Sequence, residues 1–132
     1  MKELFIPYTE ALALKELGFD GKCLAAYTNR GKFHQTSSDY WDNDSIKMIK
    51  EYTTIKLKVL APLYQQAFKW FRDKYKLSGT PQYFTGGYYC YTINDMKDTK
   101  KSNRLFTEFE TYKQAELECL RKLIEIVKKQ KN

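Results

Sequence analysis

The segment that ends at Gly79 constrains the fold more than any other part of this chain. From Pro62 onward, apolar and aromatic residues recur at helical spacing on one broad face, whereas Gln, Lys and Arg residues fall on the opposite face. Proline is well accommodated in the first turn of a helix, and Ser78–Gly79 is typical of a helix end. The pattern predicts a helix over residues 62–77 whose apolar face packs on a core.

Two further helices are predicted towards the ends of the sequence. The first covers residues 7–17, because Pro7 suits its first turn and Gly18 suits the left-handed position after its last turn. The other covers residues 111–129, where Thr111 and Gln114 fit a capping box, in which each side chain binds the backbone amide at the other position. The last few residues of the chain are expected to fray.

Between these helices, several segments have the alternation or the β-branched and aromatic composition of short strands. They are residues 22–28 and 31–35, which suit a hairpin, and residues 55–59, 82–85, 87–93 and 104–109. The polar segments 36–45 and 94–103 are predicted to be loops. We therefore expect an α+β fold in which three helices pack on a small, mostly antiparallel sheet. The length fits a single domain over residues 1–132.

The chain combines positive charge with aromatic surface. Its 132 residues carry a formal net charge of +7 and include 11 Tyr, 8 Phe and 2 Trp. Lysine attracts phosphate and aromatic rings stack on bases, so nucleotides and nucleic acids are natural partners. The sequence has no apolar run long enough to span a membrane, and its first residues are too polar for a secretory signal. We expect a cytoplasmic protein without a membrane partner.

The residue patterns of catalytic and metal sites are missing from the sequence. Cys23, Cys90 and Cys119 have no C-x-x-C spacing and are expected to be reduced and buried. His34 is the only histidine, so neither a nucleophile–base pair nor a histidine-based metal site has a second partner. The Asp-Asn-Asp segment 42–44 lacks the downstream residues of a calcium loop. We predict neither an enzyme nor a metal or cofactor site.

Two aromatic clusters are candidates for ligand contact. Tyr40 and Trp41 lie in the first polar loop, where the tryptophan is either an anchor to the core or part of a binding surface. Tyr88, Tyr89 and Tyr91 follow a double glycine on a predicted strand. Tyr89 and Tyr91 share one face of that strand and Tyr88 takes the other. One face is expected to pack on the core, and the exposed set is able to stack on a base.

Basic residues near these clusters complete the predicted site. Arginine can direct two hydrogen bonds to one phosphate, which favours Arg30 and Arg104, and the adjacent Lys100 and Lys101 suit an arm that closes over an anion. The predicted ligand-binding residues are Arg30, Tyr40, Trp41, Tyr88, Tyr89, Tyr91, Lys100, Lys101 and Arg104.

Three stretches of the sequence together resemble a known family. They are residues 5–19, which begin Phe-Ile-Pro-Tyr, residues 61–72, which begin Ala-Pro-Leu-Tyr, and residues 112–128 around Ala-Glu-Leu-Glu-Cys-Leu. They resemble short uncharacterised proteins encoded by bacteriophages and prophages, especially those of gut Bacteroidetes. The resemblance covers the three predicted helices in their order and carries no known catalytic or binding residues. It implies an accessory phage protein, for example one that sequesters a cyclic nucleotide messenger of host immunity.

These observations lead to one preferred function and its rivals. The preferred function is a small, non-enzymatic phage-type protein that sequesters a nucleotide-like signalling molecule in a basic, aromatic site, with no cofactor. A homo-oligomer that encloses the ligand at an interface fits this role. The alternatives are a DNA- or RNA-binding protein, an inhibitor that presents Tyr40 and Trp41 to a host protein, and an enzyme that acts on nucleotides. Acidic residues interspersed with the lysines, such as Asp95 and Asp98, argue against a long basic stripe for nucleic acid.

Overall fold

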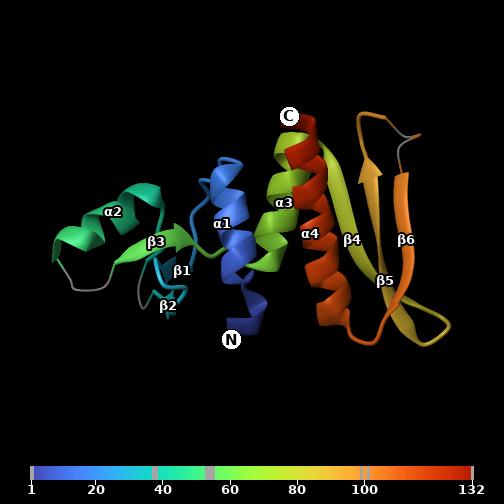
Figure 1. The fold of residues 1–132 in the computed structure, drawn as a ribbon, viewed down its shortest axis with the longest axis horizontal. Coiled ribbons are helices and arrows are strands. Elements are labelled where there is room, and N and C mark those ends of the chain that lie inside the picture. The colour runs from blue at the N-terminus through green and yellow to red at the C-terminus, as the bar shows by residue number, and fades with distance from the viewer. Residues whose placement is uncertain (1, 37–38, 53–55, 99, 101, 132) are drawn as a thin grey trace. The chain divides into compact units, whose positions relative to one another are not determined.

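The computed structural model describes residues 2–36, 39–52, 56–98, 100 and 102–131, with the side chains of 49–52 and 102–107 left aside (Figure 1). The fold is α+β, as the sequence predicts. The elements in chain order are a short 3-10 helix η1 (Lys2–Leu4), α1 (Tyr8–Glu16), β1 (Ala25–Thr28), β2 (Phe33–Gln35), α2 (Asn43–Tyr52), β3 (Leu57–Leu60), α3 (Tyr64–Tyr75), β4 (Leu77–Phe84), β5 (Tyr88–Asp95), β6 (Ser102–Phe109) and α4 (Tyr112–Lys131).

The chain divides into two compact units. The N-terminal unit comprises residues 1–65 and the C-terminal unit residues 66–132, so α3 begins at the boundary and belongs almost entirely to the second unit. Each unit has its own three-stranded antiparallel sheet. The single domain expected from the length stays a prediction.

In the N-terminal unit, the strand order is β2-β1-β3, and α1 and α2 both contact β3. The predicted hairpin is confirmed, with Gly31 at a φ of +82° in the turn between β1 and β2. Tyr27 on the central strand is 2% exposed, and its hydroxyl donates to the carbonyl oxygen of Ile6 at 2.8 Å. Phe33 packs against the Tyr27 ring, with the ring centroids 5.6 Å apart, so aromatic contacts tie the hairpin to the core.

In the C-terminal unit, β4, β5 and β6 form a meander, and α4 packs against β4 and β5 (Figure 1). The buried residues of α4 are small or apolar, among them Cys119, Leu120 and Leu123, with Glu116 as the one charged exception. A Cβ on Gly79 of β4 would lie 2.8 Å from the Cys119 sulfur and 2.9 Å from Cδ1 of Leu123. Glycine is therefore required where the helix approaches the strand most closely.

The predicted capping box at the start of α4 is confirmed. The backbone amide of Gln114 donates to Oγ1 of Thr111, and the amide of Thr111 donates to Oε1 of Gln114, both at 3.2 Å. Two amides that have no partner within the helix are thereby satisfied. The predicted helices near both chain ends are thus present, as α1 and α4.

The helix α2 was not predicted. The expected loop over residues 36–45 extends into its first turn, and the amphipathic pattern of residues 43–52 was not recognised as helical. Asp42 starts this helix as its N-cap: the backbone amide and the hydroxyl of Ser45 donate to Oδ1 of Asp42 at 2.8 and 2.9 Å. The acidic segment considered for metal binding therefore has a structural role. The structure has four α-helices among its described residues, rather than three.

The end of α3 also differs from the expectation. The helix stops at Tyr75, and Lys76 adopts a φ of +57°, so this lysine occupies the left-handed position that glycine usually takes. Ser78 and Gly79 belong to β4, which begins well before the strand predicted at 82–85. Pro81 stands in the middle of β4, paired with Tyr91 of β5. The amide of Met96 in the turn after β5 donates to the Lys76 carbonyl oxygen at 2.8 Å and thereby holds this junction.

The predicted loop at 94–103 is shorter in the structure, and the predicted strand at 55–59 is shifted towards higher residue numbers. β5 continues through Asp95 and β6 begins at Ser102, so the connection is shorter than expected. β3 covers Leu57–Leu60, and residue 55 lies outside the described residues. No helix in the described part of the chain is long and apolar enough to cross a membrane.

Candidate functional site

A pocket of about 290 Å³ lies among α1, α2 and β3 of the N-terminal unit. Its lining combines three lysines with apolar side chains and one amide. The lining residues are Lys15, Gly18, Phe19, Asn43, Ile46, Lys47, Leu57 and Lys58. A cavity of this size is at the lower end of the range for small-molecule sites in proteins.

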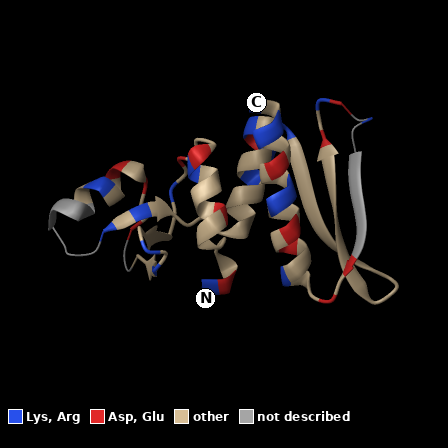
Figure 2. Ribbon diagram, in the orientation of Figure 1, with Lys and Arg blue, Asp and Glu red and all other residues tan. Residues whose placement is uncertain are grey.

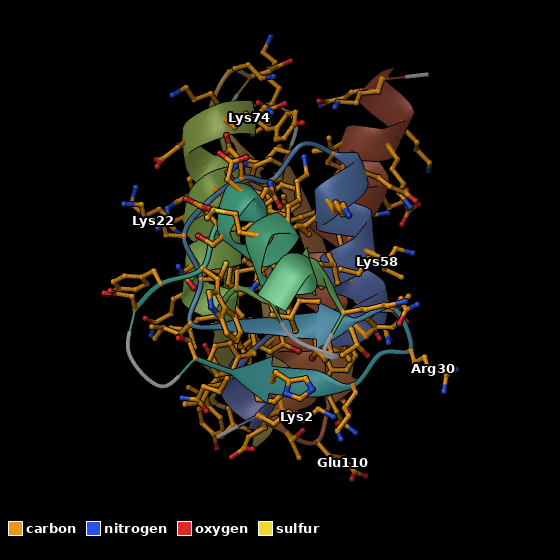
Figure 3. All side chains as sticks on the ribbon, turned by 90° about the vertical axis from the view of Figure 1, so that its left-hand side faces the viewer. Lys2, Lys22, Arg30, Lys58, Lys74 and Glu110 are labelled. Carbon is orange, nitrogen blue, oxygen red and sulfur yellow. The ribbon has the colours of Figure 1, made fainter. Side chains whose placement is uncertain are left out.

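Each of the three lysines comes from a different element. Lys15 lies in the last turn of α1, Lys47 in the second turn of α2, and Lys58 on β3 between two buried residues. The ammonium group of Lys15 donates to the carbonyl oxygen of Lys58 at 2.9 Å, which fixes one cation at the rim. Figure 3 shows the Lys58 side chain directed away from the sheet, beside the α1 ribbon.

Buried side chains form the apolar part of the lining. Phe19, Ile46 and Leu57 are 6%, 4% and 1% exposed. The turn after α1 brings Phe19 into place: Gly18 has a φ of +96°, and the backbone amide of Phe19 donates to the Leu14 carbonyl oxygen at 2.9 Å. This is a glycine-dependent helix end of the kind the sequence predicts.

The lining residues include three lysines and no carboxylate. None of the eight is Asp or Glu, although Asp42 precedes Asn43 in the sequence. Hydrogen bonds from Ser45 lower the pKa of Asp42, so this carboxylate is ionised at neutral pH and satisfies the first amides of α2. The pocket is suited to a small anion whose apolar portion contacts the phenyl ring and the aliphatic side chains.

Three of the predicted site residues lie elsewhere in the N-terminal unit. Arg30 is exposed in the turn between β1 and β2 (Figure 3), and Tyr40 is 58% exposed. Trp41 is half-buried, and its backbone makes two hydrogen bonds with that of Cys23, at 2.7 and 2.8 Å. The backbone of Trp41 is thus anchored to the unit, and none of these three residues lines the pocket.

The three tyrosines of β5 lie in the C-terminal unit. Tyr91 is 4% exposed, and burial raises its pKa to about 12, so it belongs to the core. Tyr89 packs edge-on against Tyr112 at the start of α4, with the ring centroids 6.1 Å apart. Tyr88 stacks on Phe84 across the hairpin, with the rings 3° from parallel. The face shared by Tyr89 and Tyr91 is therefore the one that packs against α4.

The remaining predicted residues follow β5. Lys100 is exposed in the connection between β5 and β6. Lys101 lies outside the described residues. Arg104 lies on β6 opposite Thr92, and its side chain is outside the description. The nine predicted site residues are therefore divided between the two units, three in the first and six in the second, and none of them lines the pocket described above.

Sequence reasoning missed the lysines of the pocket. The alternation of Lys58 with buried neighbours and the Gly18–Phe19 helix end were both visible in the sequence. Lys15 and Lys58 meet where α1 contacts β3, and Lys47 joins them through α2, a helix that was not predicted. A prediction that lacks α2 offers no reason to place Lys47 beside Lys15 and Lys58.

The cysteines are structural side chains. Cys23, Cys90 and Cys119 are free thiols and fully buried, as the sequence predicts. Burial raises the pKa of Cys23 and of Cys119 to about 12, so both are protonated at neutral pH and unreactive. In the described part of the chain, no group of three or more His, Cys, Asp or Glu residues has the arrangement of a metal site.

No protein-family model matches the chain, and neither the curated proteins nor the solved structures include a significant match to it.

Proposed function

We propose that this protein binds a small nucleotide-like anion in the lysine-lined pocket and sequesters it without chemical turnover. The observation that carries the proposal is the position of Lys15, Lys47 and Lys58 on three different elements around one pocket. Lysine ammonium groups interact with phosphate as point charges, and three of them around one cavity suit an anion with more than one negative charge.

The rest of the lining supports the same ligand class. Phe19 and Ile46 offer apolar contact to a base or a sugar ring, and the Asn43 amide is able to donate to or accept from the base. The lining residues include no carboxylate, histidine or thiol that would serve as a general base or nucleophile. This composition supports binding without turnover. The resemblance to phage-encoded proteins supports a signalling nucleotide of the host as the anion.

The test is a ligand panel followed by recovery of the ligand. The purified protein is incubated with inorganic phosphate, mononucleotides and cyclic di- and oligonucleotides, and thermal unfolding is recorded for each. We expect one nucleotide class to raise Tm and to be released intact after heat denaturation. A change in the chemical structure of the released nucleotide would show turnover and contradict the proposal.

Two matched variants locate the site. In the pocket variant, Lys15, Lys47 and Lys58 are replaced by Gln, which keeps most of the aliphatic stem and removes three charges. In the control variant, the exposed lysines Lys2, Lys32 and Lys56 are replaced in the same way. We expect the pocket variant to bind at least about tenfold more weakly, since one charge-assisted hydrogen bond contributes about 1.5–3 kcal/mol. Equal losses in both variants would mean that net charge, not the pocket, binds the ligand.

A further inference from the structure

The positive charge of the chain is concentrated in one of the two units. Residues 1–65 contain nine Lys or Arg and eight Asp or Glu, whereas residues 66–132 contain fourteen and eight. The C-terminal unit therefore carries a net charge of +6, out of +7 for the whole chain. This unit does not contain the pocket described above.

Within the C-terminal unit, the cations gather at one end (Figure 2). The end of α3, the turn after β5 and the end of α4 meet there, as two contacts show. The Met96 amide donates to the Lys76 carbonyl oxygen at 2.8 Å, and Nζ of Lys131 lies 5.9 Å from the centre of the Tyr75 ring. We call this the basic end and define it as the described residues of 69–76, 95–100 and 122–131. It contains ten Lys or Arg and four Asp or Glu.

Each of the four carboxylates at the basic end has a partner inside the unit. Asp73 pairs with Lys69 at 2.6 Å, and Glu125 pairs with Lys129 at 3.0 Å and with a second lysine. Asp95 accepts from the backbone amide two residues later at 2.9 Å, and Asp98 does the same at 3.1 Å. These contacts hold the acids within their own turns, so they do not separate the lysines as the sequence alone suggested.

Several ammonium groups remain available at this end. Among the described residues, Lys97, Lys100 and Lys128 form no ion pair, and all three belong to exposed turns or helix ends. They come from the turn after β5 and from the end of α4. An extended polyanion is therefore able to contact both elements at once.

Aromatic rings lie beside the cations of the basic end. Nζ of Lys74 lies 5.2 Å from the centre of the Trp70 ring and 5.6 Å from that of Tyr75. The two rings are half-buried and meet edge-on, with centroids 5.4 Å apart. Figure 3 shows Lys74 at one end of the C-terminal unit and Glu110 at the other. The aromatic and cationic groups thus share one end of the unit, away from Glu110.

We propose that the basic end binds single-stranded nucleic acid, with the lysines on successive phosphates and the Trp70–Tyr75 pair beside a base. Phosphate neutralisation by lysine supplies affinity without sequence preference, and an aromatic ring stacks on any unpaired base. A duplex presents the same phosphates, but its bases are already stacked on one another, so they are not available to stack on Trp70 or Tyr75. This site and the pocket share no residue, and the inference goes beyond the proposed function.

The test uses fluorescence anisotropy with labelled single strands of deoxythymidine and uridine, each about twelve nucleotides long. We expect both to bind more tightly than a duplex of the same length. With about four phosphates contacted, affinity should fall about 50-fold between 50 mM and 200 mM salt. A duplex that binds as tightly as the single strands would overturn the inference. Binding to vesicles with about 30% phosphatidylserine, and not to oligonucleotides, would assign the surface to anionic membranes instead.

Three variants separate the basic end from general charge. Replacement of Lys97, Lys100 and Lys128 by Gln should weaken oligonucleotide binding at least about tenfold and reduce the salt dependence towards that of one contact. The Gln variants at Lys2, Lys32 and Lys56 and at the pocket lysines change net charge equally and should bind normally. A loss of the same size in either of these two would contradict the inference, whatever the outcome for the pocket.

Stacking has its own signal. In a Trp41→Phe variant, Trp70 is the only tryptophan of the chain, so its fluorescence reports on the basic end alone. We expect the single strands to quench this fluorescence on binding, and to quench it less in the Lys97, Lys100 and Lys128 variant at the same concentration. Binding with no change in Trp70 fluorescence would show that the Trp70–Tyr75 pair does not contact the bound strand.

Discussion

The two units of this protein have similar sheets and very different distributions of charge. The N-terminal unit is nearly neutral, yet three of its lysines surround one pocket. The C-terminal unit carries most of the net charge, and its lysines are spread over one end formed by two helix termini and a turn. The net charge of a unit therefore does not show whether its cations converge on one pocket. A few converging cations suit a small ligand, and many dispersed cations suit a polymer.

The units also differ in what holds them together. In the N-terminal unit, aromatic rings connect the hairpin to the chain before α1 and to the first residue of α1: Phe5 meets Phe33 with ring centroids 5.3 Å apart, and Tyr8 meets Tyr27 at 5.4 Å. In the C-terminal unit, one long helix lies close to a sheet at Gly79. The packing of the N-terminal unit depends on large aromatic side chains, whereas the packing of α4 on β4 depends on the absence of a side chain at Gly79. The predictions below test this contrast.

The largest effect is expected at the closest approach of helix and sheet. The Gly79→Ala substitution places a methyl group against the Cys119 sulfur and Leu123, and we expect it to lower the free energy of unfolding by about 2–3 kcal/mol. Urea unfolding followed by circular dichroism measures this loss. Thr80→Val, at the exposed neighbouring position, is the control. A loss below about 0.5 kcal/mol for Gly79→Ala would show that the helix has room to move away.

A second effect appears at alkaline pH. Burial raises the pKa of Cys23 in one unit and of Cys119 in the other from 9.0 to about 12. Above pH 9 the unfolded thiol loses its proton while the folded thiol keeps it, so the unfolded state binds fewer protons and stability falls as pH rises. Each thiol should reduce the free energy of unfolding by about 1.4 kcal/mol per pH unit between these values.

Urea unfolding at pH 9 and pH 10 compares the wild type with Cys23→Ala and Cys119→Ala, and only the change between the two pH values is considered. Each variant should lose the part of the pH response that its own thiol contributes and keep the part contributed by the other thiol. The sensitivity should increase above pH 10 in both units, because burial also raises the pKa of Tyr91 from 10.0 to about 12 and raises the pKa of Tyr27 above 10.0. A pH response in the Cys119→Ala variant as large as that of the wild type below pH 10 would contradict this account.

The smallest effect distinguishes the helix caps of the two units. Thr111→Ala removes the acceptor for the Gln114 amide in α4 and should cost about 1 kcal/mol at any pH. Asp42→Ala removes the cap of α2, whose strength depends on an ionised carboxylate. Because the pKa of Asp42 is lowered in the folded state, its contribution is present at neutral pH and is lost as the pH falls through that value.

Thermal unfolding at pH 7 and at about pH 3 measures both caps. The difference between wild type and Asp42→Ala should shrink in acid, whereas the difference for Thr111→Ala should persist. Asp42→Asn, which keeps an oxygen acceptor without charge, is the matched control and should respond less to pH than the wild type. Parallel pH responses in all variants would mean that Asp42 acts only through its shape.

Local signals in the sequence predicted much of the fold. Pro7 and Gly18 bracket α1, and the Thr111–Gln114 box begins α4, because these features act within a few residues of one another. The helix α2 has its Asp42 cap and an amphipathic pattern as local signals, which were overlooked. The helix α3 ends at Tyr75, and Lys76 takes the left-handed position that a sequence pattern assigns to glycine. Tertiary contacts, such as the Met96 hydrogen bond to Lys76, stabilise these departures.

The candidate site was harder to predict than the fold. The alternation of Tyr88, Tyr89 and Tyr91 on β5 followed from strand geometry. The buried face of the strand is decided by the position of α4, which the strand pattern does not reveal. The pocket lysines and the basic end both arise from segments that are far apart in the sequence. A single sequence shows the charges and gives no information about which of them meet.

The proline in β4 has a consequence for the protein at high concentration. β4 is an edge strand, and open backbone amides along such an edge can recruit a strand from another molecule. Pro81 has no amide hydrogen to offer, so it divides the edge into two short pieces and opposes growth of a sheet across copies. In the proposed role of sequestration, the protein has to be as abundant as the molecule that it removes. The amount of ligand that it can hold then depends on its resistance to aggregation at high concentration, and Pro81 contributes to that resistance.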